Sequence, residues 1–356
     1  MTDLVAAVDV GTGSARAGVF DAAGRMLGRA EAPIAMREPA RDRAEQDGED
    51  IWRAVGTALR AARSEAAAAP EAVAGVGFDA TCSLVLRDAA GRPLAVSGDA
   101  GEGWDTLLWL DHRARAEAAE CTATGHAVLG AVGGVMSPEM QIPKLMWLKR
   151  ARPEAWARLG LAFDLADFLT WKASGSTARS TCTLACKWGW LGHAPPGWRP
   201  DFLAAVGLDD LVARAGLPDA AAPVGADLGP LTAAAAAHLG LTPRARVAAG
   251  LIDAHAGALG VLGGLPPQTR ARRAALVAGT SNCLMAITAA PLASPGLWGP
   301  VRDAALPGLW LTEGGQSAAG ALLDHVCRIG GGAPDPALHA RISARIAELR
   351  SVEGWD

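Results

Sequence analysis

The sequence LVAAVDVGTGSARAGVFD, residues 4–21, decides the fold. Two short apolar runs flank the turn Gly11–Ser14, and apolar runs of this length bounded by Gly and Asp are typical of strands. Glycines such as Gly11 and Gly13 let backbone N–H groups come close to an anion. Thr12 adds a hydroxyl donor, and Arg16 adds a positive charge. The stretch therefore predicts a β-hairpin whose turn is a candidate phosphate-binding site.

Two better-known phosphate loops do not match this turn. A Walker A loop requires Lys followed by Ser or Thr after its last glycine, and the chain continues Ser14-Ala15 instead. A dinucleotide-binding turn requires a third glycine and a following helix, whereas Arg16 stands here and a strand follows. For this stretch alone, a plain hairpin turn without a ligand remains an alternative.

The same layout recurs at residues 275–287, ALVAGTSNCLMAI, where an apolar strand leads into Gly279-Thr280-Ser281 and out into another apolar strand. Two such hairpins, far apart in one chain, suggest two similar lobes that face one polyphosphate. This is the scheme of the actin-like ATPase (ribonuclease H-like) fold. In that scheme the first acidic residue, here Asp9, points at the metal ion on the phosphates.

Composition limits the class of protein. The chain has 356 residues, enough for two domains, and its 50% hydrophobic and 20% charged content is ordinary for a globular protein. A net charge of −4 gives no electrostatic reason to expect a nucleic acid or an anionic membrane as a partner. No apolar run approaches the roughly 20 residues of a membrane helix, and no basic segment precedes an apolar stretch at the N-terminus. These features predict a cytoplasmic protein.

The six cysteines are spread along the chain, and none forms a CxxC pair. The pair Cys182 and Cys186 has no second pair of ligand residues close by in sequence, so the spacing predicts no zinc site. Free thiols in a reducing cytosol are the simplest interpretation.

Apolar spacing places the other elements around the two hairpins. Residues 32–48 are polar and are predicted to be irregular, whereas residues 49–69 carry apolar side chains at helical spacing. Strands are predicted over 73–78 and 246–250. The sequence thus predicts an α/β protein of two lobes. We expect the N-terminal lobe at 1–250 and the start of a second, incomplete lobe at 251–356.

Seven motifs stand out along the chain: Asp9–Arg16, Phe78–Ser83, Trp109–Arg113, Met140–Leu148, Gly250–Gly257, Gly279–Asn282 and Glu313–Ser317. They appear in the order seen in the FGGY carbohydrate kinases. Within that family the chain most resembles the pentulose kinases of the D-ribulokinase type. The resemblance implies ATP and Mg²⁺ as cofactors, a small sugar as substrate, and sugar- and phosphate-binding residues in the N-terminal lobe.

The resemblance implies a general base at Asp253, which falls at the carboxyl end of a strand and before a helix. Ligands collect at such strand ends, and a carboxylate suits phosphoryl transfer because that reaction depends mainly on positioning and charge neutralisation. Two alternatives stay open: Asp253 caps the helix, or His255 is the base.

The resemblance also assigns binding roles. Asp9 is implied as the metal-organising carboxylate. Lys187 is a sugar-ligand candidate because lysine rarely lies inside an apolar run without a partner. For Asp111 a helix N-cap, and for Arg16 an exposed strand charge, remain alternatives. The phosphate-binding candidates are Gly11, Thr12, Gly13, Ser14 and Arg16 from one lobe and Gly279, Thr280 and Ser281 from the other. The sugar-binding candidates are Asp79, Thr81, Asp111, Lys187, Asp253 and Glu313.

The sequence departs from the family at its C-terminal end. Family members continue well past position 356 with a glycine-rich adenosine-binding segment, and no such loop follows Gly330–Gly332 here. We expect an ATP-dependent pentulose 5-kinase with D-ribulose as the first candidate substrate. The alternatives are a kinase for L-ribulose, xylulose or a pentitol, a non-catalytic sugar-binding remnant, and an ATPase that works on protein partners. A homodimer is left open.

Overall fold

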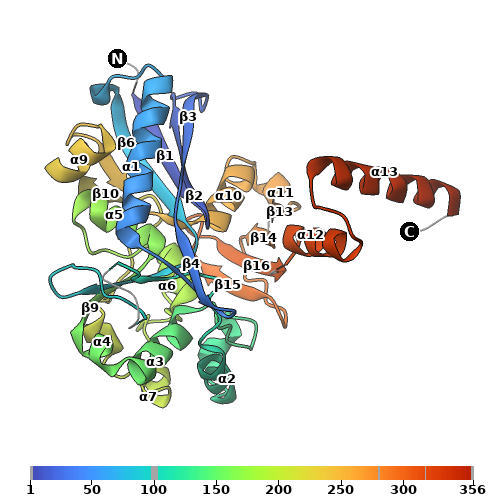
Figure 1. Cartoon of the computed structure of the whole chain (residues 1–356). Helices are drawn as coiled ribbons and strands as arrows, with labels where there is room; N and C mark the ends of the chain where they lie inside the picture. The colour runs from blue at the N-terminus through green and yellow to red at the C-terminus, as the bar shows by residue number, and fades with distance from the viewer. Residues whose placement is uncertain (1–2, 98–102, 280, 317, 354–356) are drawn as a thin grey trace.

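The computed structural model describes residues 3–97, 103–279, 281–316 and 318–353. It contains three β-sheets with helices packed around them (Figure 1). The helices are α1 (Gly48–Glu65), α2 (Arg115–Ala123), α3 (Gln141–Ala151), α4 (Pro153–Arg158), α5 (Leu165–Ser174), α6 (Thr181–Lys187), α7 (Pro200–Ala205), α8 (Leu211–Arg214), α9 (Ala233–Leu239), α10 (Asp253–Leu262), α11 (Pro267–Arg270), α12 (Gly320–Ile329) and α13 (Pro336–Glu353).

The first sheet carries the N-terminal hairpin. Its order is β10-β11-β6-β1-β2-β3, and β12 also pairs with β6. β1 is antiparallel to β2, as the hairpin prediction requires, and parallel to β6. Because β6, β1 and β12 run in the same direction, their carboxyl ends meet at one edge. The strands are β1 (Leu4–Val10), β2 (Ser14–Phe20), β3 (Met26–Pro33), β6 (Val73–Ala80), β10 (Asp227–Pro230), β11 (Arg246–Ala248) and β12 (Leu251–Ile252).

Helix α1 covers this sheet, packing across β2 and β3. Its N-terminus is capped by Asp47, whose carboxylate accepts a hydrogen bond of 2.8 Å from the backbone N–H of Glu49. Ile51, Val55 and Leu59 lie on one face and are completely buried. The predicted helical face is therefore confirmed, although the helix ends at Glu65 rather than at residue 69.

The second sheet shows that the prediction of irregular structure at 32–48 was wrong. The sheet runs β4-β5-β8-β7-β9, and its first two strands fall inside that segment. Hydrophobic patterning misses them because Glu45 and Gln46 are polar and yet buried, Glu45 pairing with Arg113 at 2.7 Å. The strands are β4 (Met36–Ala40), β5 (Arg43–Gln46), β7 (Leu84–Asp88), β8 (Thr106–Leu107) and β9 (Leu159–Asp164).

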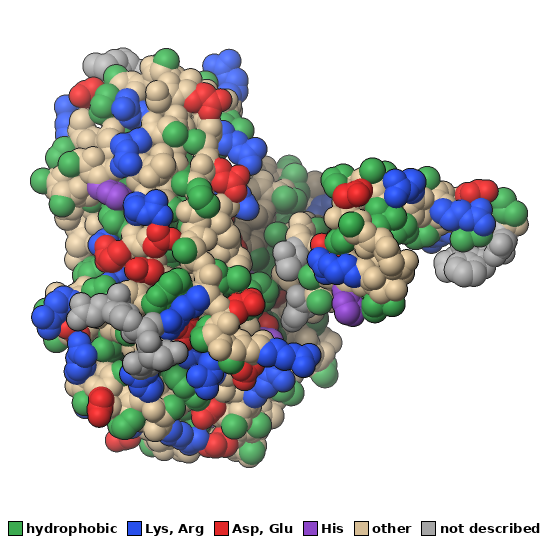
Figure 2. All heavy atoms as spheres, in the orientation of Figure 1, with side chains coloured by type: hydrophobic (Ala, Val, Ile, Leu, Met, Phe, Trp, Pro, Cys, Tyr) green, Lys and Arg blue, Asp and Glu red, His purple; other side chains and the backbone are tan. Residues whose placement is uncertain are grey.

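The third sheet carries the second hairpin and has the order β13-β14-β16-β15, with every pair antiparallel. Helix α10 packs against β13 and β14 on one side. Helices α12 and α13 extend away from the rest of the molecule, and hydrophobic side chains lie on the surface of this extension (Figures 1 and 2). The strands are β13 (Ala275–Ala278), β14 (Asn282–Thr288), β15 (Trp298–Arg302) and β16 (Trp310–Gln316).

Within the part of the chain that the structure describes, no helix has both the length and the apolar character needed to cross a membrane. The division of the chain at residue 250 stays a proposal.

Candidate functional site

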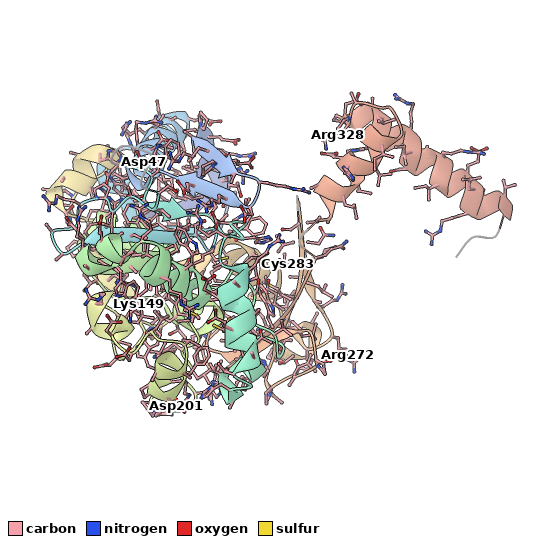
Figure 3. All side chains as sticks on the ribbon, turned by 60° about the horizontal axis from the view of Figure 1, so that its bottom comes forward. Asp47, Lys149, Asp201, Arg272, Cys283 and Arg328 are labelled. Atoms are coloured by element: carbon pink, nitrogen blue, oxygen red, sulfur yellow. The ribbon has the colours of Figure 1, made fainter. Side chains whose placement is uncertain are left out.

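A cleft of about 720 Å³ lies where the first and third sheets face each other. Its walls come from the carboxyl ends of β1, β6 and β12, the start of α10, and both glycine hairpins. Figure 3 labels one lining residue, Cys283 of β14. The two hairpins, far apart in sequence, thus reach one cavity.

Three carboxyl groups meet at one end of this cleft. Asp9 and Asp79 are register partners on the parallel strands β1 and β6. Asp253 begins α10, two residues after Leu251, which pairs with Asp79. The parallel pairing of three strand ends is therefore what gathers these side chains.

The surroundings shift the titration of two of these carboxyls. Burial, together with the charges of Asp9 and Asp253, raises the pKa of Asp79 to about 9. Burial also raises the pKa of Asp253, against the effect of a hydrogen bond of 2.7 Å from the N–H of Ala254. Asp79 therefore keeps a proton at neutral pH, which relieves the repulsion within the group.

This arrangement fits a divalent cation. Mg²⁺ prefers oxygen ligands and is bound through one or two carboxylates together with substrate phosphates. Without a cation, repulsion within the carboxyl cluster is relieved by the proton on Asp79. A bound divalent cation would relieve the same repulsion and so stabilise the cluster. Asp9 is the candidate to hold it, because its carboxylate is partly exposed in the cleft.

The first hairpin is held by contacts from other elements. The backbone N–H of Gly11 donates to the carbonyl of Ser14 at 3.0 Å and closes the turn. Trp109 Nε1 donates to the Thr12 hydroxyl at 3.0 Å, and Gln46 Nε2 donates to the Thr12 carbonyl at 2.7 Å. The turn is thus fixed from two sides before any ligand binds.

Only some of the residues of this hairpin that were predicted to bind phosphate line the cleft. Gly11, Thr12 and Arg16 line the cleft, and Arg16 pairs with Asp9 at 2.9 Å. Gly13 and Ser14 are not among the described lining residues, and Ser14 is buried. A contact from these two to a phosphate stays a prediction that this geometry does not favour.

The second hairpin is also closed by a glycine N–H, in a turn that is one residue shorter than the first. The backbone N–H of Gly279 donates to the carbonyl of Ser281 at 2.9 Å, and both residues line the cleft. Asn282, which the sequence reasoning did not single out, lines it as well. The prediction for Thr280 lies outside the described residues.

A buried charged pair, Lys187 and Glu313, also lines the cleft. Glu313 on β16 is 8% exposed, and Lys187 at the end of α6 is 5% exposed. Burial acts to raise the pKa of Glu313, but the charge of Lys187 and a hydrogen bond from His255 lower it to about 2. Burial alone would lower the pKa of Lys187, whereas nearby acidic groups raise it. Both groups are therefore charged and face the cleft, where they can bind hydroxyl or carbonyl groups.

Two further lining residues were not predicted. Trp298 on β15 places its ring 4.2 Å below the Lys187 ammonium, a cation–π contact. Cys82, beside Thr81, lines the same wall. Trp298 follows a long loop, and nothing in its spacing distinguishes it from the other tryptophans.

His255, the alternative candidate for the general base, is less suited to that role than Asp253. Its Nε2 lies 3.2 Å from the Glu313 carboxylate and its Nδ1 lies 3.1 Å from Cys182 Sγ. With both ring nitrogens engaged and the ring 1% exposed, neither is free to accept a proton from a substrate.

Asp111 is not brought into the cleft. It is completely buried, its carboxylate pairs with Arg113 at 2.7 Å, and it accepts a hydrogen bond of 2.8 Å from the backbone N–H of Ala44. The position of Asp111 therefore does not support the predicted sugar contact. Its carboxylate instead holds β5 against the Trp109–Arg113 segment. Thr81, by contrast, lies in the cleft wall, where its hydroxyl is 3.1 Å from that of Ser83.

Comparison with known proteins identifies the family. The N-terminal domain of the FGGY family of carbohydrate kinases matches residues 4–260, and its C-terminal domain matches residues 274–351. The chain belongs to the FGGY family of carbohydrate kinases.

Individual relatives agree with this assignment. An FGGY carbohydrate kinase domain-containing protein of Danio rerio is 49% identical over 90% of this chain and 60% of its own length. A D-ribulokinase of Saccharomyces cerevisiae is 39% identical over 90% of this chain and 49% of its own length. The chain thus spans about half to three fifths of the curated relatives it matches.

The fold has a close counterpart among solved structures. The xylulose kinase from Rhodospirillum rubrum superimposes with a TM-score of 0.80 at 22% identity, over 97% of this chain and 67% of that one. The predicted α/β fold of the actin-like ATPase type is confirmed.

Proposed function

We propose that the protein phosphorylates D-ribulose with ATP, giving D-ribulose 5-phosphate. The observation that carries the proposal is that Asp9, Asp253 and the two glycine hairpins line the same cleft as Lys187 and Glu313. A triphosphate and a small polar acceptor can therefore lie side by side. Similarity to a D-ribulokinase supports D-ribulose as the acceptor.

The reaction assigned to Asp253 is removal of a proton from a terminal sugar hydroxyl. As that oxygen bonds to the γ-phosphorus of ATP, the bond to the bridging oxygen breaks, ADP leaves, and the proton resides on the Asp253 carboxyl. Burial raises the pKa of Asp253 and so makes the carboxylate a stronger base than a solvated one. Its position at the start of α10, beside the carboxyl ends of β1 and β6, holds it next to the phosphate hairpins.

The phosphates are bound by the hairpins. The side chains of Thr12 and Arg16 supply donors from one side of the cleft, and those of Ser281 and Asn282 supply donors from the other. A bound Mg²⁺, held through Asp9, would neutralise charge on the phosphates as they react. Arg16 supplies further positive charge from the same end.

The acceptor is positioned by Lys187 and Glu313, an ammonium donor and a carboxylate acceptor on facing walls. Because both are buried, leaving one of them without a sugar partner costs more than at an exposed site, and this gives discrimination among sugars. Trp298 fixes the Lys187 ammonium from one side.

A location in the cytoplasm is part of the proposal. All six cysteines are free, as expected in a reducing compartment that also supplies ATP.

The test is ADP release in the presence of D-ribulose, L-ribulose, D-xylulose and ribitol. We expect the highest kcat/KM with D-ribulose. Lys187→Met should raise the sugar KM by about 10-fold or more, because a charged hydrogen bond contributes about 1.5–3 kcal/mol. The control Lys149→Met removes a lysine of α3 that bonds to Asp210 and does not line the cleft (Figure 3), and it should behave like the parent. ADP release that is indifferent to sugar would overturn the proposal.

A further inference from the structure

A second cluster, of potential metal ligands, lies beside the sugar end of the cleft, the part lined by Lys187 and Glu313. It has no role in the proposed reaction. Cys182 and Cys186 stand one turn apart on α6, and His255 lies in the first turn of α10. One potential ligand atom from each residue lies within 4.8 Å of the other two. Two helices therefore bring two sulfurs and one imidazole to the same point.

The hydrogen bonds of His255 orient its ring as in a metal site. Its Nε2 is 3.2 Å from the Glu313 carboxylate, which accepts a hydrogen bond, so this nitrogen carries a proton. The opposite nitrogen, Nδ1, faces Cys182 Sγ at 3.1 Å. Histidines that bind metals usually donate their other N–H to a carboxylate in this way. The backbone N–H of Ile252, 3.5 Å from Cys182 Sγ, is an additional donor to that sulfur.

The donor set selects a soft cation. Two thiolates and one imidazole are ligands typical of Zn²⁺, and with Zn–S near 2.3 Å and Zn–N near 2.0 Å the ligand atoms stand about 3.5–3.8 Å apart. Ligand atoms within 4.8 Å reach that spacing by side-chain movements of about 1 Å. Mg²⁺ prefers oxygen ligands, so the carboxyl cluster and this cluster select different metals.

The site is buried but borders the cleft. Cys182 and His255 are 0% and 1% exposed and Cys186 is 9% exposed, while His255 is also one of the cleft-lining residues. An ion can therefore reach the cluster from the sugar side.

We propose that Cys182, Cys186 and His255 form a binding site for Zn²⁺ or another thiophilic divalent cation. Binding displaces the proton shared between Cys182 Sγ and His255 Nδ1, together with the Cys186 thiol proton, and leaves a fourth coordination position for water. Because His255 holds Glu313, the bound cation also changes the sugar end of the cleft. That second consequence rests on the proposed function, whereas metal binding itself does not.

The first experiment is a titration of the full, reduced, metal-free chain with Co²⁺, followed by displacement with Zn²⁺. We expect one equivalent of Co²⁺ to give a sulfur-to-cobalt charge-transfer band that Zn²⁺ abolishes. Cys182→Ser and Cys186→Ser should each lose that band or greatly weaken it. Glu313→Gln should lower the affinity by about 10–100-fold, the usual effect of removing the partner of a ligating histidine.

Cys121→Ser is the matched control, because Cys121 is equally buried but contacts Met146 instead. It should bind Co²⁺ like the parent, and circular dichroism of each variant checks that it is folded. A parent chain without the band, or a band retained in both Cys182→Ser and Cys186→Ser, would overturn the metal site.

The second experiment measures D-ribulose binding by calorimetry with and without one equivalent of Zn²⁺. We expect Zn²⁺ to weaken D-ribulose binding at least about 10-fold in the parent and to have no effect in Cys186→Ser. Equal affinity with and without bound Zn²⁺ contradicts the coupling. Absence of D-ribulose binding in both conditions contradicts the proposed function instead, so the two failures are distinguishable.

Discussion

The two glycine hairpins share a strand–turn–strand layout but differ in chemistry. In the first, the register partners one pair away from the turn are Asp9 and Arg16, which form an ion pair at 2.9 Å. In the second, the corresponding partners are Val277 and Cys283. The comparison teaches that the first hairpin brings charged side chains to the cleft, whereas the second brings the neutral side chains of Ser281 and Asn282.

The hairpins also differ in how their strands are covered. Helix α1 lies over β2 and β3, and the first hairpin has Val8 and Val10 completely buried. In the second hairpin Leu276 and Leu284 are 60% and 52% exposed, although α10 covers the opposite side. The similar sequence patterns of the two hairpins therefore give antiparallel strand pairing in both. The burial of their apolar side chains depends instead on whether another element packs on the outer face of the sheet.

The largest expected effect tests this difference in cover. Leu59→Ala removes a completely buried side chain of α1, and we expect a loss of about 2–5 kcal/mol in the free energy of unfolding. Leu284→Ala makes the same chemical change at an exposed position and should stay within about 0.5 kcal/mol. Chemical denaturation of both variants measures the contrast. Comparable losses would show that the outer face of the third sheet is buried in solution.

The second prediction tests the difference in charge. Arg16→Ala should weaken Mg·ATP binding roughly 10–100-fold, since hydrogen bonds to charged groups contribute about 1.5–3 kcal/mol. Asn282→Ala, in the second hairpin, removes a neutral group and should cost less than about 10-fold. Calorimetry with Mg·ATP compares the two. The account of unequal hairpins fails if the Asn282 variant loses as much affinity as the Arg16 variant.

The third prediction concerns Asp164, a buried carboxyl at the end of β9 in the second sheet. Burial raises the pKa of Asp164 to about 8, and its Oδ1 and the Oε1 of Gln141 have no hydrogen-bond partner among the described residues. A carboxyl with a raised folded-state pKa destabilises the protein increasingly as pH rises from about 4 to about 8. Asp164→Asn removes that charge and offers a donor to Gln141, so it should stabilise the chain.

The gain from Asp164→Asn should be small at pH 5 and reach at least about 1 kcal/mol near pH 8, measured by thermal melts across that range. Asp201→Asn is the control, because Asp201 is exposed (Figure 3) and its pKa is lowered by a hydrogen bond from His126. A stability difference independent of pH would contradict the raised pKa of Asp164.

Sequence reasoning reached the hairpins because glycine turns are local features, whereas the resemblance to the FGGY family implied that Asp9, Asp79 and Asp253 serve one site. Sequence reasoning could not place Asp111, since a helix start and a buried ion pair with Arg113 have the same sequence pattern. Nor could it find Trp298, whose position depends on how β15 packs against α6.

The prediction of no zinc site stays a prediction, and the reasoning behind it has the same limit. It considered only ligands near Cys182 and Cys186 in sequence, whereas the fold brings His255 from another helix. Strand β5 was missed because its buried residues include Glu45 and Gln46, whose burial is made possible by partners distant in sequence. Strand β4 was missed because none of its residues is buried.

The central claim is that Asp253 accepts the proton of a sugar hydroxyl in the cleft shared by both hairpins. The most direct measurement is D-ribulose-dependent ADP release by the parent chain and by Asp253→Asn, with the exposed Asp227→Asn as control. The account predicts turnover by the parent and by the control, and a kcat lower by about 10²–10⁴-fold in Asp253→Asn. Equal kcat in Asp253→Asn and the parent, or no D-ribulose-dependent turnover by the parent, would contradict it.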